Sequence, residues 1–281
     1  MTLVRMPNSE SNIHTAISPV FAWNDNKSPR VVGTAILLGP CLALTALHVV
    51  EDFVCRNRQE AEVNVNVAVY HAFTGAAWYV RRTWATTHTD AAFLGLRPQN
   101  DAAKNFKWHR VGINLHLPKP GEKIFAAGFR HSKIDDVDEG FNQEGITVVK
   151  ASLSLQTVNG TVRESYGSKH EGHLDFPCFQ CNAKFDSQMS GGPVLDESGY
   201  LRGLVCTSFE FDSTDMSEPV SFVAGILPVM AIKIDRTLPE LNEVSPYHVL
   251  DLARNGFLPV MGHERVMITD LKEGRTRIEF K

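Results

Sequence analysis

Hydrophobic residues in this chain fall in short runs, and the runs are separated by glycine, proline, asparagine and aspartate. Within residues 62–71, valines alternate with small or polar residues, which is the period-two pattern of a half-buried strand. Helical periodicity is scarce, so the pattern predicts an all-β barrel or sandwich. The predicted strands are residues 16–23, 30–37, 41–45, 62–71, 77–84, 91–96, 122–129, 145–153, 174–181, 194–195, 200–207 and 219–227.

Polar stretches divide the strands into two groups. Residues 97–117, with Pro98 near their start, are predicted to link the groups, and residues 130–144 and 159–172 are predicted to be loops. After residue 234 the pattern changes, and we expect a short helix from Ser245-Pro246 to Asn255-Gly256, then a hairpin. The expected units are residues 1–118, residues 119–234 and a C-terminal extension of residues 235–281.

Residues 31–50 form a stretch of twenty residues without formal charge, long enough to cross a membrane as a helix. Gly39-Pro40 interrupts its middle, and polar residues such as Thr34 and His48 break its apolar surface. A strand, a turn and a second strand explain this segment better than a membrane helix does. We therefore expect no membrane association.

Composition narrows the class further. The chain has 281 residues, of which 43% are hydrophobic and 21% charged, and this suits a globular protein with a large core. A net charge of -4 provides no overall positive potential that would attract nucleic acid. Residues 1–12 do not resemble a secretory signal, and five cysteines are an odd number. We therefore expect a cytoplasmic protein with reduced thiols.

Three residues suggest acyl-transfer chemistry. Ser190 precedes two glycines and Pro193, and residues without side chains let another backbone approach the hydroxyl closely. His48 ends an apolar run, and Asp90 stands just before one. Alone, these residues suit a tight hairpin, a packed core histidine and a turn or cap aspartate. Together they follow the order His, Asp, Ser, which is one known order of the catalytic triad.

These motifs resemble a known family. Thr45-Ala46-Leu47-His48 is similar to the T-A-x-H motif of trypsin-like (chymotrypsin-fold) serine peptidases. Residues 89–94 look like that family's aspartate box, and residues 189–193 look like its nucleophile turn. The resemblance extends over about residues 15–234. It implies two six-stranded antiparallel barrels, an active site in the cleft between them, and serine endopeptidase activity of an intracellular, non-zymogen type.

The resemblance also implies the role of each residue. Ser190 would be the nucleophile, His48 the general base, and Asp90 the group that orients His48. Residues Gln188, Met189 and Ser190 would form the oxyanion hole, with the N–H groups of Gln188 and Ser190 as donors. The family usually has glycine at the position of Gln188, and a misplaced peptide there would leave a slow enzyme. A weakly active or inactive binding scaffold, controlled by a partner protein, is the alternative.

The expected substrate site follows from the same resemblance. Residues Cys206, Thr207 and Ser208 match the strand that pairs with the substrate backbone. Lys184 matches the floor of the primary specificity pocket, where it would favour an acidic side chain, although a solvated loop charge explains it equally well. Met189 stands where secreted members carry an activating aspartate. We therefore expect the chain to be competent without N-terminal cleavage.

A zinc-stabilised interaction domain is a third interpretation. His170, His173, Cys178 and Cys181 are residue types that bind structural zinc. However, Cys178 and Cys181 lie in a predicted strand, and residues three apart on a strand point to opposite faces. We therefore predict no metal and no cofactor. Proteins or peptides are the expected partners, together with a possible regulatory protein.

Overall fold

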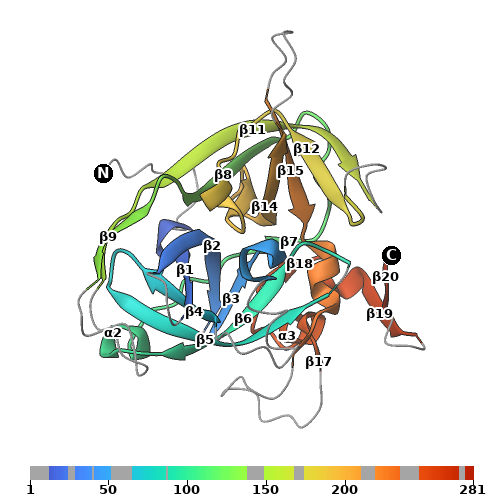
Figure 1. Ribbon diagram of the computed structural model, residues 1–281. Coiled ribbons are helices and arrows are strands. Elements are labelled where there is room, and N and C mark those ends of the chain that lie inside the picture. The colour runs from blue at the N-terminus through green and yellow to red at the C-terminus, as the bar shows by residue number, and fades with distance from the viewer. Residues whose placement is uncertain are drawn as a thin grey trace.

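Six antiparallel strands close the first β-barrel (Figure 1). The computed structural model describes residues 13–24, 29–39, 41–51, 65–86, 88–137, 149–167, 174–209, 219–234, 247–271 and 276–281. Around the barrel the strand order is β1-β2-β3-β6-β5-β4, and pairing of β1 with β4 closes it. Val67 and Val69 are buried, as the alternation predicts. The strands are β1 (Ile17–Asn24), β2 (Arg30–Gly39), β3 (Leu42–Thr45), β4 (Val65–His71), β5 (Ala76–Ala85) and β6 (Ala92–Pro98).

A second ring of six antiparallel strands follows in the order β13-β8-β11-β12-β15-β14, and pairing of β13 with β14 closes it. Two closed six-stranded antiparallel barrels confirm the predicted chymotrypsin-like fold. The strands are β8 (Lys123–Phe129), β11 (Leu155–Tyr166), β12 (Cys178–Cys181), β13 (Pro193–Asp196), β14 (Leu201–Phe209) and β15 (Val220–Gly225).

Two stretches predicted to be polar loops contain strands, so those predictions are wrong. Residues 159–172 overlap β11, which pairs with β8 along one edge and with β12 along the other. Val162 is the one fully buried residue of β11, so backbone hydrogen bonds hold this strand without an apolar alternation that a sequence could show. Residues 130–144 contain β9 (Lys133–Val137), which pairs with β10 (Val149–Ser152) in a separate two-stranded sheet.

The predicted linker and C-terminal extension meet between the barrels (Figure 1). In the linker, α2 (Asp101–Lys104) is followed by β7 (Ile113–Asn114), which pairs in parallel with both β14 and β18 (Val260–Met261). The expected helix and hairpin of the extension are present as α3 (Val249–Arg254) and the pair β19 (Val266–Asp270) and β20 (Thr276–Phe280). The remaining short elements are η1 (Ile13–Thr15), η2 (Ser187–Met189), η3 (Leu227–Ala231), η4 (His263–Arg265), β16 (Lys233–Ile234) and β17 (Tyr247–His248).

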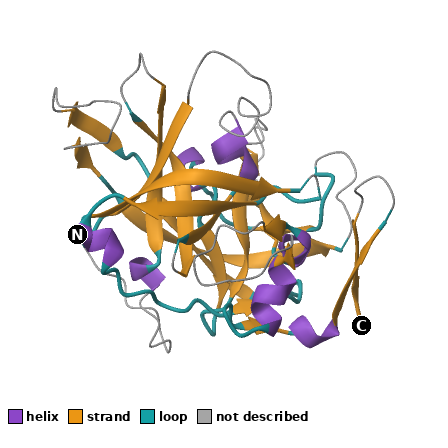
Figure 2. Cartoon of the chain, turned by 90° about the horizontal axis from the view of Figure 1, so that it is seen from below, coloured by secondary structure: helices purple, strands orange, loops and turns teal. Residues whose placement is uncertain are grey.

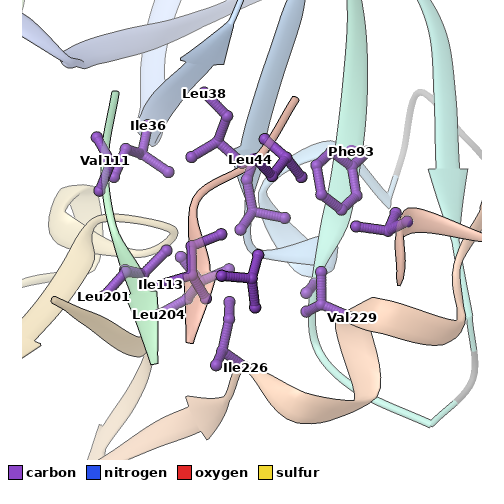
Figure 3. Packing of buried hydrophobic residues seen from close by; sticks show 14 of the residues in the cluster. Ile36, Leu38, Leu44, Phe93, Val111, Ile113, Leu201, Leu204, Ile226 and Val229 are labelled. Carbon is purple, nitrogen blue, oxygen red and sulfur yellow. The ribbon is translucent and has the colours of Figure 1, made fainter. Parts of the chain in front are cut away.

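One hydrophobic core joins the two barrels. Ile36, Leu44 and Phe93 of the first barrel point toward Ile113 and Leu204 on the second-barrel side (Figure 3). The same core includes buried side chains of η3 and α3. Figure 2 shows the short helices of the chain around the strands. Burial of apolar surface stabilises such contacts by about 25 cal/mol per Å². The C-terminal segment thus helps to hold the barrels in one relative position.

The apolar segment 31–50 forms β2, β3 and the first part of a helical turn. Among the residues that the structure describes, no helix is long and apolar enough to cross a membrane. Cys178, Cys181 and Cys206 are in no disulfide, and Cys55 lies outside the described residues.

Candidate active site

His48 and Asp90 are in direct contact. The Asp90 Oδ2 atom lies 2.7 Å from His48 Nδ1, and the backbone N–H of His48 donates to Asp90 Oδ1 at 3.0 Å. His48 lies in the helical turn of residues 47–51 after β3, and Asp90 lies just before β6, the strand that pairs with β3. With Nδ1 facing the carboxylate, the other ring nitrogen of His48 is left to act on a substrate or a nucleophile.

Ser190 lies between η2 and β13, in a turn pressed against the first barrel. At Gly191, where φ is +79°, an added Cβ would lie 2.7 Å from the Ala46 nitrogen and closer still to Thr45 Oγ1 and Thr34 O. At Gly192 an added Cβ would lie 2.8 Å from Met189 O and closer to Ala127 O. The two glycines therefore allow backbone from both barrels to approach the serine turn.

Cys206 links Asp90 to Ser190. Its Sγ atom lies 3.0 Å from Asp90 Oδ2, and its carbonyl oxygen accepts a long hydrogen bond of 3.5 Å from Ser190 Oγ. Burial, followed by the nearby Asp90 carboxylate, raises the pKa of the Cys206 thiol, so the thiol stays protonated and donates to Asp90. No hydrogen bond joins Ser190 to His48 in this conformation of the described residues.

Two of the three N–H groups of the predicted oxyanion turn, those of Met189 and Ser190, donate to carbonyls of the same turn. The N–H of Ser190 donates to Ser187 O at 3.2 Å, and the N–H of Met189 donates to Asp186 O at 2.9 Å. These bonds close the single 3₁₀ turn η2. The Ser190 donor that the resemblance assigns to an oxyanion is therefore not free in this conformation.

Residues outside the turn hold its two ends. Gln188 Nε2 donates to Ser132 O at 2.9 Å, and Ser132 N–H donates to Gln188 Oε1 at 2.7 Å. Arg130 forms an ion pair with Asp186. Thr34 of β2 donates from its hydroxyl to Gln188 O at 2.8 Å. Met189 is fully buried in an apolar cluster, so this turn is fixed without a charged residue at that position.

A cleft of about 550 Å³ opens beside the His48–Asp90 pair. Leu47, Leu174 and Phe176 give it apolar surface, and Glu51 adds a carboxylate. Two of the predicted substrate-strand residues, Cys206 and Thr207, line the cleft, and Ser208 follows them on β14. Lys184 is exposed and does not line this cleft, so its place in a specificity pocket stays a prediction.

Only half of the zinc ligand set falls in the described residues, because His170 and His173 lie outside them. Cys178 and Cys181 of β12 are both fully buried and belong to different hydrophobic clusters. Desolvation raises their thiol pKa values to about 11 and about 12. Where the chain is described, no cluster of three metal-binding side chains is found.

Two closed antiparallel barrels, with His48 and Asp90 on one and Ser190 on the other, define the chymotrypsin-like class of fold. Residues 33–204, more than half of the chain and including all three of these residues, match the family model described as trypsin-like peptidase domain. The chain therefore belongs to the trypsin-like peptidase family. Protein or peptide is the substrate class that this membership implies.

The solved structures that this chain matches are distant in sequence. Deg5 is 16% identical, with a TM-score of 0.49, and the match covers 77% of this chain and 86% of Deg5. The active form of the Rv3671c protease from M. tuberculosis is also 16% identical, with a TM-score of 0.49, covering 76% of this chain and 77% of that one. A comparison with curated proteins gave no match.

Sequence reasoning assigned no role in the candidate site to Thr34, Arg130 or Ser132. Thr34 had a signal, because it is a polar residue inside the apolar run of β2 and its side chain is fully buried. Arg130 and Ser132 had none, because both lie in a polar stretch and Ser132 holds Gln188 through its backbone. A contact made by backbone atoms does not require a particular residue type, so the sequence does not reveal it.

Proposed function

We propose that this protein is a serine endopeptidase that hydrolyses peptide bonds through an acyl-enzyme, with His48, Asp90 and Ser190 as its triad. The observation that carries the proposal is the two-point contact between Asp90 and His48, at 2.7 Å to Nδ1 and 3.0 Å to the backbone N–H. Two bonds to one carboxylate fix both the position and the tautomer of the imidazole. Cys206, which contacts both Asp90 and Ser190, supports the assignment of the nucleophile.

In the proposed reaction, Ser190 Oγ attacks the carbonyl carbon of the scissile bond while His48 Nε2 takes the hydroxyl proton. The resulting imidazolium is stabilised by Asp90, and it passes the proton to the leaving amine as the C–N bond breaks. A water molecule then attacks the ester, His48 accepts the proton of the water, and this proton returns to Ser190. One water molecule is consumed per peptide bond, and the enzyme is regenerated.

The substrate backbone is proposed to lie along β14. In the described strands, residues 207 and 208 pair with β15 on one edge, and no strand pairs with their other edge. A free strand edge binds an extended peptide through main-chain hydrogen bonds. Beside this edge, Leu174 and Phe176 offer an apolar wall next to His48, which favours substrates with an apolar side chain at that point.

Hydrolysis of an unstructured protein such as casein, and of a fluorogenic peptide library, tests the proposal. The wild-type chain should cleave, and Ser190→Ala should reduce cleavage to background while unfolding at the same temperature. Full activity in Ser190→Ala would disprove the proposal. An inactive binding scaffold is the second candidate, and the hydrogen bond from Ser190 N–H to Ser187 O favours it. A folded wild-type chain without any cleavage would support that candidate.

A further inference from the structure

The C-terminal hairpin has a strand edge that no other described strand covers. Among the described strands, β19 and β20 pair only with each other, and Figures 1 and 2 show this pair at the outside of the molecule. One face of the hairpin packs on the core that joins the barrels, through Ile268, Ile278 and Phe280. An unpaired edge can accept a further strand, and a two-stranded sheet gains stability when it does.

The register of the hairpin shows which groups face the free edge of β20. The N–H of Lys281 donates to Arg265 O at 2.9 Å, so these opposite residues form a hydrogen-bonded pair. Hydrogen-bonded and non-hydrogen-bonded pairs alternate in an antiparallel ladder, so Arg277 and Glu279 also bond to β19. The alternate residues of β20 therefore direct their N–H and C=O groups to the free edge. They are Thr276, Ile278 and Phe280.

The charges on β20 make this strand complementary to itself. Arg277 and Glu279 share one face of the strand, and their side chains are 67% and 39% exposed. If two copies of β20 pair antiparallel about Ile278, Arg277 of each copy lies opposite Glu279 of the other. Both charge pairs then occupy non-hydrogen-bonded positions, where opposite side chains are closest. The groups that face the free edge bond to one another in the same arrangement.

Other registers are disfavoured by the same residues. A shift by two residues places Arg277 opposite Arg277 of the second copy in one direction, and Glu279 opposite Glu279 in the other. Like charges directly opposite each other destabilise a strand pair. A shift by one residue sets the free groups of one copy against residues that already bond to β19. The sequence of β20 thus selects one register, which has two-fold symmetry.

Exposed apolar side chains gather in the same C-terminal extension. Phe257, Met261, Met267 and Leu271 are 39–46% exposed, and only two other large hydrophobic residues are exposed in the described part of the chain. Apolar side chains that collect in one region of a surface are typical of a region that contacts another protein. This composition supports the extension as an interaction surface independently of the β20 charges.

We propose that the free edge of β20 is a docking surface for a second copy of this chain, and that two copies pair β20 with β20 into a four-stranded antiparallel sheet. None of the residues that line the cleft beside His48 belongs to the hairpin, so the inference goes beyond the proposed peptidase function and does not depend on it. One short strand from each copy makes a small interface, and we expect a dissociation constant of about 10–100 μM.

Charge reversal in the full chain tests the register. Arg277→Glu makes both positions acidic and Glu279→Arg makes both basic, so each variant should raise the dissociation constant by about tenfold or more. An equimolar mixture of the two variants restores opposite charges at every position, and it should associate within about threefold of wild type. Lys104→Glu is the matched control, because it makes the same change of net charge at an exposed residue of α2. This control should associate as wild type does.

Sedimentation velocity at low ionic strength measures association over about 5–300 μM, a range that brackets the expected dissociation constant. Amide hydrogen exchange then locates the contact. The β20 peptide of wild type should exchange more slowly at high than at low concentration, and that of Arg277→Glu should not. Thermal unfolding checks that each variant is folded.

A wild-type chain that stays monomeric throughout this range would overturn the inference. Association of either single variant as strong as that of wild type would also overturn it, because another surface would then be in use. A mixture of the two variants that stays monomeric would contradict the proposed register. Peptidase assays are not needed for any of these outcomes, so the inference and the proposed function can fail separately.

Discussion

The Thr34 hydroxyl donates a 2.8 Å hydrogen bond to the carbonyl oxygen of Gln188, two residues before Ser190. The same hydroxyl accepts the N–H of Phe129 on β8 at 2.9 Å, and the N–H of Thr34 donates to Ser190 O at 2.9 Å. Thr34 of the first barrel thus forms hydrogen bonds both to the turn that contains Ser190 and to strand β8 of the second barrel. Its side chain fixes the turn that contains Ser190 relative to the barrel that carries His48 and Asp90.

Removal of that hydroxyl should weaken the fold. Thr34→Val keeps the shape of the side chain but leaves Gln188 O and Phe129 N–H without this partner, and we expect a loss of about 1–3 kcal/mol in the free energy of unfolding. Thr34→Ser retains the hydroxyl and should lose less. Urea denaturation measures both. Equal losses in the two variants would show that the hydroxyl is not what matters.

Gly191 should tolerate no side chain. Gly191→Ala combines a φ of +79° with a Cβ placed 2.7 Å from the Ala46 nitrogen, so we expect a loss of more than about 3 kcal/mol in the free energy of unfolding. Gly121 is the matched control, because its φ is +89° and an added Cβ there meets nothing within 4 Å. Gly121→Ala should cost about 1 kcal/mol. Similar losses in the free energy of unfolding for Gly191→Ala and Gly121→Ala would contradict close packing of the barrels at the turn.

Cys206 should act through its hydrogen bond to Asp90. Cys206→Ser preserves a donor at the position of the thiol, which lies 3.0 Å from Asp90 Oδ2, so kcat should stay within about threefold of wild type. Cys206→Ala removes the donor and should lower kcat by about tenfold. Steady-state kinetics with one peptide substrate compares them. A fall in Cys206→Ser as deep as that in Cys206→Ala would mean that the residue contributes packing alone.

His71 should make the stability of the first barrel depend on pH. Burial, opposed by a hydrogen bond to the backbone of Thr15 and aided by His14 and His109, lowers its pKa from 6.5 to about 4. The native state therefore holds this imidazole neutral, while the unfolded chain binds a proton below about pH 6.5. The stability of the fold is therefore not reduced by this group above about pH 6.5, and it falls as the pH drops toward 4, by about 1–3 kcal/mol once solvent screening is allowed for.

Denaturation of wild type and His71→Gln at pH 7.5 and pH 4.5 checks this expectation. The wild-type chain should lose more stability between the two pH values than the variant does, because only the wild type takes up a proton at this site on unfolding. An equal loss in the two proteins would place the acid sensitivity in other groups.

The sequence predicted the fold where residue type records the environment. Val67 and Val69 of β4 share one buried face, and the glycines after Ser190 are needed because backbone from both barrels approaches them. The strand β11 was missed, because it is held by pairing on both edges and shows no apolar pattern. Strand assignment from pattern fails where backbone hydrogen bonds replace side-chain burial.

Some features of the candidate site can likewise be predicted from the sequence, and others cannot. The roles proposed for His48, Asp90 and Ser190 depend on their side chains, so the motifs that suggest these roles can be found in the sequence alone. Other features of the site depend on backbone geometry. They are the orientation of the Ser187–Gln188 peptide and the hydrogen bonds between the Ser132 backbone and the Gln188 side chain. The only sign of this arrangement in the sequence is that Gln188 stands where the family usually has glycine. The resting state of the oxyanion turn therefore needed the structure.

The most direct test of the proposed triad is to map the residue that a fluorophosphonate modifies. The wild-type chain should gain one adduct, located by tandem mass spectrometry on Ser190, because only a serine next to a base reacts at a useful rate. His48→Ala and Ser190→Ala should gain none, while both remain folded. An adduct at another residue, or undiminished modification of Ser190 in His48→Ala, would contradict the proposal that His48 activates Ser190 for acyl transfer.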